Sequence, residues 1–80
     1  MQLENHILYF KPTCPYCLKV LSFMRNEDIE MEKRDTWEPA NAAELVAIGG
    51  KPQVPCLVID GKALYESDDI IAYLRAKTAS

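Results

Sequence analysis

The side chains in this 80-residue sequence best suited to chemistry are two cysteines separated by two residues, Cys14 and Cys17. Such a pair can exchange a disulfide or supply half of a zinc site, and a disulfide closing so short a loop adds little stability. A zinc site usually requires two more ligands, for which the sequence offers Cys56 and His6. The pattern therefore favours dithiol redox chemistry over a metal site or a structural bridge.

The flanking residues place the pair where a strand meets a helix. The run His6–Phe10 is typical of a buried strand, and Pro15 suits the first turn of a helix that Thr13 can cap or lead into. Apolar positions then recur at helical spacing, namely Cys17, Val20, Leu21 and Met24. Free N–H groups at a helix start favour a thiolate at Cys14, whereas Cys17 lies on the buried face. An exposed nucleophile beside a sheltered partner suits dithiol exchange.

Length and composition indicate one globular domain over residues 1–80. The net charge of −3 and the pI of about 5.0 do not indicate the excess positive charge that binds nucleic acid or an anionic membrane. Three cysteines do not form a disulfide framework and suit a reducing compartment. With no signal-peptide pattern at its start and no run of membrane-spanning length, we expect a cytoplasmic monomer.

The rest of the chain alternates strand and helix patterns. The expected elements are an edge strand over 29–34, a helix from between Pro39 and Asn41 to Gly49–Gly50, a central strand over 56–59, a strand over 62–65 and a final helix after Ser67. The predicted order is βαβαββα, an α/β fold with a four-stranded mixed sheet flanked by three helices.

Local signals add detail to this outline. Asn41 with Glu44 resembles a capping box, and Val46 is expected on the inner face of the second helix beside Ala42 and Leu45. Ser67 is expected to cap the last helix. We also expect Cys56 to be a buried thiol without a catalytic role.

Three motifs together resemble the glutaredoxins, which have the thioredoxin fold. These are Cys14-Pro15-Tyr16-Cys17 after the first strand, Val54-Pro55 before the third, and Ser67-Asp68-Asp69 at the start of the last helix. Two positions depart from the family pattern. Glu66-Ser67 is more similar to the Glu-Ser pair in the glutathione-binding domain of glutathione transferases, and Gln53 stands where many glutaredoxins have Thr.

The resemblance implies a glutathione site. It implies a cis Val54-Pro55 peptide whose valine backbone pairs with the cysteinyl part of glutathione. It assigns the γ-glutamyl carboxylate to Ser67 and Asp68, and the glycyl carboxylate or the thiolate to Lys11. The remaining residues of the implied site are Tyr16, Gln53 and Glu66. An anion site at a helix start with adjacent acids also suits a head group that carries both charges.

The sequence therefore predicts a glutathione-dependent thiol–disulfide oxidoreductase, with Cys14 as nucleophile and Cys17 as resolving thiol. Glutathione would be the cosubstrate, with protein disulfides or glutathionylated proteins as partners and no metal or tightly bound cofactor. Two alternatives remain open. One is a redoxin reduced by thioredoxin reductase, and the other is an iron–sulfur carrier ligated by Cys14 and glutathione.

Overall fold

The computed structural model describes residues 1–79, and its elements follow the predicted order βαβαββα. They are β1 (Gln2–Phe10), α1 (Pro15–Asn26), β2 (Glu30–Asp35), α2 (Pro39–Gly49), β3 (Cys56–Ile59), β4 (Lys62–Tyr65) and α3 (Ser67–Thr78). None of the helices within these residues is long and apolar enough to span a membrane.

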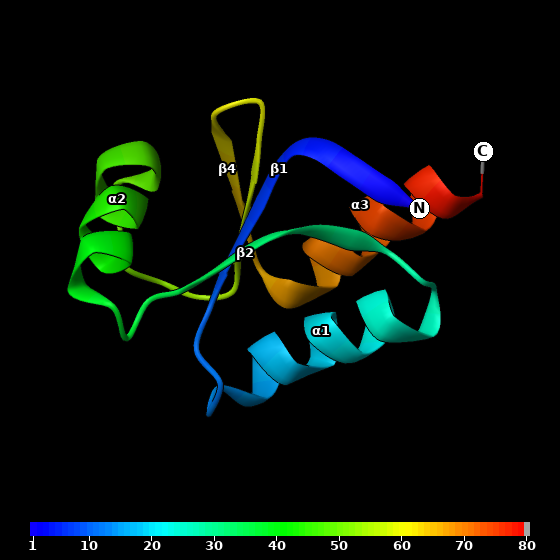
Figure 1. Cartoon of the computed structure of the whole chain (residues 1–80), viewed down its shortest axis with the longest axis horizontal. Coiled ribbons are helices and arrows are strands. Elements are labelled where there is room, and N and C mark those ends of the chain that lie inside the picture. Colours follow the sequence, from blue (N-terminus) through cyan, green and yellow to red (C-terminus); the bar gives the residue numbers. More distant parts are fainter. Residues whose placement is uncertain (80) are drawn as a thin grey trace.

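The strands form one mixed sheet in the order β2-β1-β3-β4. β1 is parallel to β2 and antiparallel to β3, which is antiparallel to β4. In Figure 1, α1 and α3 lie together on one side of the sheet and α2 lies on the other. This arrangement confirms the predicted thioredoxin-like α/β fold, with β2 at an edge of the sheet.

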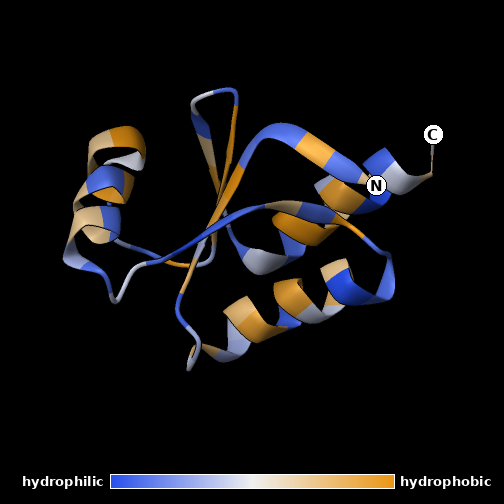
Figure 2. Ribbon diagram, in the orientation of Figure 1, coloured by the Kyte–Doolittle hydropathy of each residue, from blue (hydrophilic) through white to orange (hydrophobic). Residues whose placement is uncertain are grey.

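The core is divided unequally between the two sides of the sheet. The larger cluster lies under α1 and α3 and consists of Leu8, Val20, Met24, Ile29, Met31, Leu57, Ile70, Ile71 and Leu74. The smaller cluster lies under α2 and consists of Tyr9, Leu45, Cys56 and Val58. Figure 2 shows hydrophobic residues concentrated on the central strands and alternating with hydrophilic residues along α1. The sheet is therefore packed mainly against the α1–α3 layer.

Local details of the second helix differ from the prediction. Val46 is 42% exposed, because within α2 only Leu45 is buried against the sheet. The helix follows Glu38 with no side-chain cap, and the Asn41 amide donates instead to the Asp35 carbonyl (3.0 Å). The capping-box prediction is thus wrong, since Asn41 and Glu44 both bond to groups outside the helix.

Candidate functional site

The turn from β1 into α1 is closed by the thiol of Cys14 itself. Cys14 occupies the cap position, with φ −86° and ψ 118°, and its Sγ accepts a hydrogen bond from the Cys17 N–H (3.4 Å). Thr13 therefore belongs to the turn and is not the cap. Side chains at a helix start accept from otherwise unpaired N–H groups, and partial positive charge there favours an anion. The half-buried Cys14 sulfur thus lies where a thiolate is stabilised.

Cys17 has the opposite environment. It is completely buried, as predicted, and burial raises the pKa of its thiol to about 12. The Lys11 N–H donates to Cys17 Sγ (3.5 Å), which opposes this rise, whereas the nearby Cys14 thiol adds to it. Two cysteines three positions apart therefore differ in exposure, and the buried one is held as a thiol.

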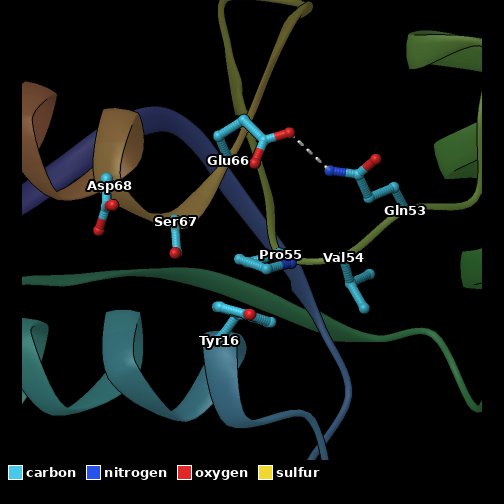
Figure 3. Close-up of a pocket in the computed structure, with 7 residues that line it drawn as sticks. All are labelled: Tyr16, Gln53, Val54, Pro55, Glu66, Ser67 and Asp68. Carbon is cyan, nitrogen blue, oxygen red and sulfur yellow. Dashed lines mark hydrogen bonds between the residues drawn. The ribbon is translucent and has the colours of Figure 1, made fainter.

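Seven of the residues predicted to bind glutathione line a single cavity of about 420 Å³ (Figure 3). They are Tyr16, Gln53, Val54, Pro55, Glu66, Ser67 and Asp68. Cys14 Sγ lies 4.0 Å from the Val54 carbonyl oxygen, which connects the thiol to the wall of the cavity. Lys11 is not among the lining residues; it is half-buried beside the cysteines. Motifs far apart in the sequence thus meet at one end of the sheet, beside its central strands β1 and β3.

The wall formed by the start of α3 has an unusual backbone. Glu66 takes φ 74° and ψ 119°, a conformation that costs a residue with a side chain about 1–3 kcal/mol and concentrates at functional sites. Glu66 therefore occupies the cap position and buried Ser67 is the first helical residue, so the prediction of a Ser67 cap is wrong by one position. Ser67 and Asp68 lie in the first turn, where N–H groups are open to an anion.

The opposite wall is the segment that leads from α2 to β3. Its Val54-Pro55 peptide is cis, as the resemblance implies. The Gln53 amide donates to the Glu66 carboxylate (3.3 Å) and links this wall to the start of α3, as Figure 3 shows. The two walls are therefore joined directly by side chains.

Tyr65 of β4 holds this segment from behind. Its hydroxyl donates to the Lys51 carbonyl (3.0 Å), and the Lys51 ammonium lies 4.5 Å from the centre of its ring. A Cβ at Gly49 would come within 1.9 Å of the Tyr65 hydroxyl oxygen, so any other residue here would displace the Tyr65 side chain. Sequence reasoning missed both residues. The signal was Gly49, because Gly50 alone (φ 88°) is enough to end the helix and the glycine before it needs another reason.

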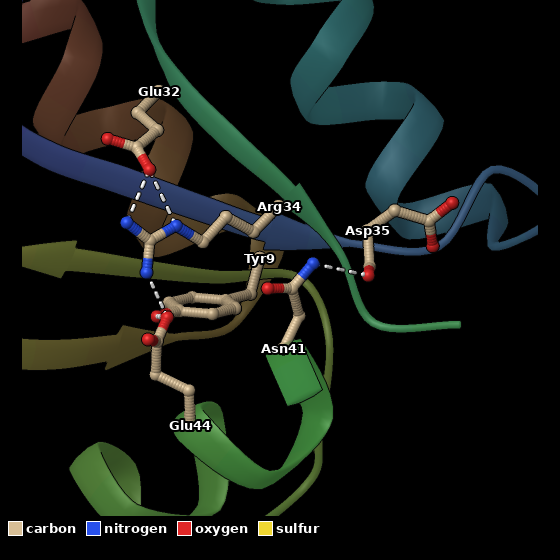
Figure 4. Close-up of polar contacts among 6 residues, drawn as sticks. All are labelled: Tyr9, Glu32, Arg34, Asp35, Asn41 and Glu44. Carbon is tan, nitrogen blue, oxygen red and sulfur yellow. Dashed lines mark hydrogen bonds and ion pairs between the residues drawn. The ribbon is translucent and has the colours of Figure 1, made fainter. Parts of the chain in front are cut away.

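A polar network secures α2 to the sheet on the side away from α1 and α3 (Figure 4). The hydroxyl of completely buried Tyr9 donates to Glu44, which also pairs with Arg34. Arg34 bonds in turn to Glu32 (2.6 Å). Burial raises the pKa of Tyr9 to about 12, and hydrogen bonds from Tyr9 and Arg34 lower the pKa of Glu44.

Neither of the other two candidate ligands for a metal, Cys56 and His6, lines the cavity. Cys56 is buried, as predicted, and burial raises the pKa of its thiol. His6 bonds through Nδ1 to the Glu4 carbonyl (2.7 Å) and through Nε2 to the Tyr73 hydroxyl (2.8 Å). Over residues 1–79, no three His, Cys, Asp or Glu side chains gather in a group that could hold a metal ion.

Solved structures place this fold among glutathione transferases and glutaredoxins. Glutathione transferase Omega 3C from Trametes versicolor superposes with a TM-score of 0.82 and 22% identity. The superposition covers 98% of this chain and 35% of the transferase chain. The holo form of glutaredoxin C1 from Populus tremula x tremuloides gives a TM-score of 0.69 and 18% identity, covering 94% and 78%. At these identities the similarity establishes the thioredoxin-like fold.

Sequence comparison defines the family. The model of the glutathione S-transferase N-terminal domain matches residues 8–80, and the chain belongs to this family. Glutaredoxin-C4 from Arabidopsis thaliana is 37% identical over 71 residues, covering 81% of this chain and 51% of the plant protein. The chain spans about half or less of the length of the curated relatives that it matches. The protein thus combines a glutathione transferase domain with a glutaredoxin-like Cys-Pro-Tyr-Cys motif.

Proposed function

We propose that this domain is a glutathione-dependent thiol–disulfide oxidoreductase in which Cys14 is the nucleophile and Cys17 the resolving thiol. The asymmetry of the two cysteines carries the proposal. Cys14 is accessible and accepts a backbone N–H at the start of α1, whereas Cys17 is completely buried and its pKa is raised to about 12. Stepwise exchange requires this arrangement, in which one thiol attacks first and a buried second thiol reacts only afterwards.

The reaction consists of two exchanges at Cys14. The Cys14 thiolate attacks the glutathione sulfur of a glutathionylated substrate, so the Cys14–glutathione disulfide forms and the substrate leaves as a thiolate. A second glutathione thiolate then attacks that mixed disulfide, which releases glutathione disulfide and restores Cys14. With an internal protein disulfide, Cys17 attacks the mixed disulfide after losing its proton, and glutathione later reduces the Cys14–Cys17 bond.

Glutathione would occupy the cavity beside Cys14. The Val54 backbone is available to pair with its cysteinyl part, and the first turn of α3 at Ser67 offers N–H groups to its γ-glutamyl carboxylate. Tyr16, Gln53, Pro55 and Glu66 would complete this site, with Asp68 facing the ammonium. Lys11 lies outside the cavity, and its proposed role is at the thiols, where its backbone already contacts Cys17.

Conjugation of glutathione to an electrophile is a second candidate function. It is favoured by the match of residues 8–80 to the glutathione S-transferase N-terminal domain. The two functions differ in what becomes of glutathione, which is oxidised to its disulfide in exchange but forms a thioether in conjugation. Chlorodinitrobenzene, a standard electrophile for conjugation, distinguishes them.

The test is a coupled assay with a glutathionylated peptide, glutathione, glutathione reductase and NADPH. We expect the protein to accelerate NADPH consumption, whereas thioredoxin reductase in place of glutathione and its reductase should give none. Turnover supported only by thioredoxin reductase would contradict the proposal. The visible spectrum of freshly purified protein tests the iron–sulfur alternative. The proposal also includes a monomeric state and a location in the reducing cytoplasm, where the three thiols would stay free.

A further inference from the structure

The charges in the cavity are all of one sign. Of its seven lining residues, Glu66 and Asp68 carry carboxylates and none carries a basic side chain. The start of α3 supplies partial positive charge through its N–H groups. A ligand head group with a carboxylate and an ammonium would therefore find a partner for each charge, while a purely anionic one would also face the two acids.

Asp68 already has a cationic partner outside the cavity. Lys19 of α1 forms an ion pair with Asp68 across the junction of α1 and α3. Both side chains are largely exposed, 53% for Lys19 and 82% for Asp68. A pair of this kind changes an equilibrium constant by only about one- to fivefold. It is therefore weak enough for a bound cation to replace.

The position of Lys19 limits what it can do. It does not line the cavity, so its effect on a ligand would pass through the charge of Asp68. Asp68 does line the cavity, and Figure 3 shows it beside Ser67 at the start of α3. Lys19 thus neutralises in part the carboxylate that a ligand's ammonium would use.

We propose that Lys19 is a specificity-determining residue, which competes with the ammonium of a bound α-amino-acid head group for Asp68. The inference rests on the proposed glutathione function and concerns the head group that the site accepts. With Lys19 paired to Asp68, the cavity discriminates less against ligands that lack the ammonium. Without Lys19, the full charge of Asp68 favours a zwitterionic head group.

Two ligands that differ only in the ammonium test this role. They are S-methylglutathione, which cannot exchange disulfides, and its analogue with a glutaryl group in place of γ-glutamyl. Calorimetry on the reduced protein gives the ratio of the analogue's dissociation constant to that of S-methylglutathione. Lys19→Met should raise this ratio about two- to fivefold. Lys62→Met is the matched control, since it removes an exposed lysine outside the cavity and should leave the ratio unchanged.

Asp68→Asn supplies the second arm of the test. In that background Lys19→Met should have no further effect on the ratio, because the carboxylate for which Lys19 competes is gone. An unchanged ratio in Lys19→Met, or an equal rise in Lys62→Met, would overturn the inference while leaving the glutathione site intact. If neither ligand bound the wild-type protein, the proposed function itself would fail, and the role of Lys19 with it.

Discussion

The two sides of the sheet are held to it in different ways. On the α1–α3 side, nine buried side chains form the larger cluster of the core, and Cys14 stands at the start of α1. On the α2 side the buried cluster has four members, and the polar network of Tyr9, Glu44 and Arg34 supplies additional attachment. The first side carries Cys14 and Cys17 together with the cavity wall at the start of α3. The second side carries Cys56 in its buried cluster and, through the segment after α2, supplies Gln53 and Val54 to the cavity. The cavity is therefore assembled from both sides of the sheet, while the two sides should differ in how their packing and polar contacts respond to substitution.

The largest difference between the two sides should appear in stability. Leu74 of α3 and Leu45 of α2 are both completely buried leucines on helices. We expect Leu74→Ala to lower the free energy of unfolding by about 3–5 kcal/mol and Leu45→Ala by about 2–3 kcal/mol, because the smaller cluster relaxes more easily around a cavity. Urea denaturation measures both. A larger loss for Leu45→Ala would contradict the unequal division of the core.

The contribution of the polar network to stability should become measurable at alkaline pH. The pKa of Tyr9 is raised from 10.0 to about 12 in the folded protein. An unfolded chain loses this proton first, so the stabilisation is complete below pH 10 and is lost as the pH rises from 10 to 12. Tyr9→Phe should cost about 1–2 kcal/mol at neutral pH and should flatten the fall in stability over that alkaline range. An equally steep alkaline fall in the variant would rule out this role for Tyr9.

A smaller effect, on the KM for glutathione, should distinguish substitutions behind the cavity wall from substitutions elsewhere. Tyr65→Phe removes the hydrogen bond to Lys51 behind the wall and should raise the KM for glutathione about fivefold with little change in kcat. The matched control is Tyr73→Phe, which removes the bond from a tyrosine hydroxyl to His6 away from the cavity. Steady-state kinetics should show no change in KM for the control. Equal KM values for the two variants would mean that Tyr65 has only a structural role.

Sequence patterns predicted the elements where local signals agree with tertiary packing. The bounds of β3 and β4 are as predicted, because a short apolar run and the turn at Asp60-Gly61 fix them locally. β1 begins at Gln2 and not at His6, since pairing with β2 extends it through a polar stretch that has no strand pattern of its own. Nothing in the residue type of Glu66 signals its positive φ. For this reason the prediction put the cap of α3 at Ser67, one residue too late.

The same distinction between local signals and tertiary contacts applies to the residues of the site. Cys14, Cys17 and the residues of the cavity were predictable because each belongs to a short motif or to the segment around one. Lys19 and Tyr65 were missed, because their partners Asp68 and Lys51 are distant in the sequence and only the fold brings them together. Glu44 was misinterpreted for the same reason, since its partners Tyr9 and Arg34 come from two other elements.

The central claim is that Cys14 alone performs glutathione exchange and that Cys17 is needed only for internal disulfides. The direct measurement is turnover of a glutathionylated peptide, with glutathione and glutathione reductase, by Cys14→Ser and Cys17→Ser. Cys17→Ser should keep turnover well above the uncatalysed rate, because a second glutathione completes the cycle. Cys14→Ser should fall to that rate, since a hydroxyl has almost no anionic form at neutral pH. Loss of turnover in both variants, with each still folded, would contradict the account.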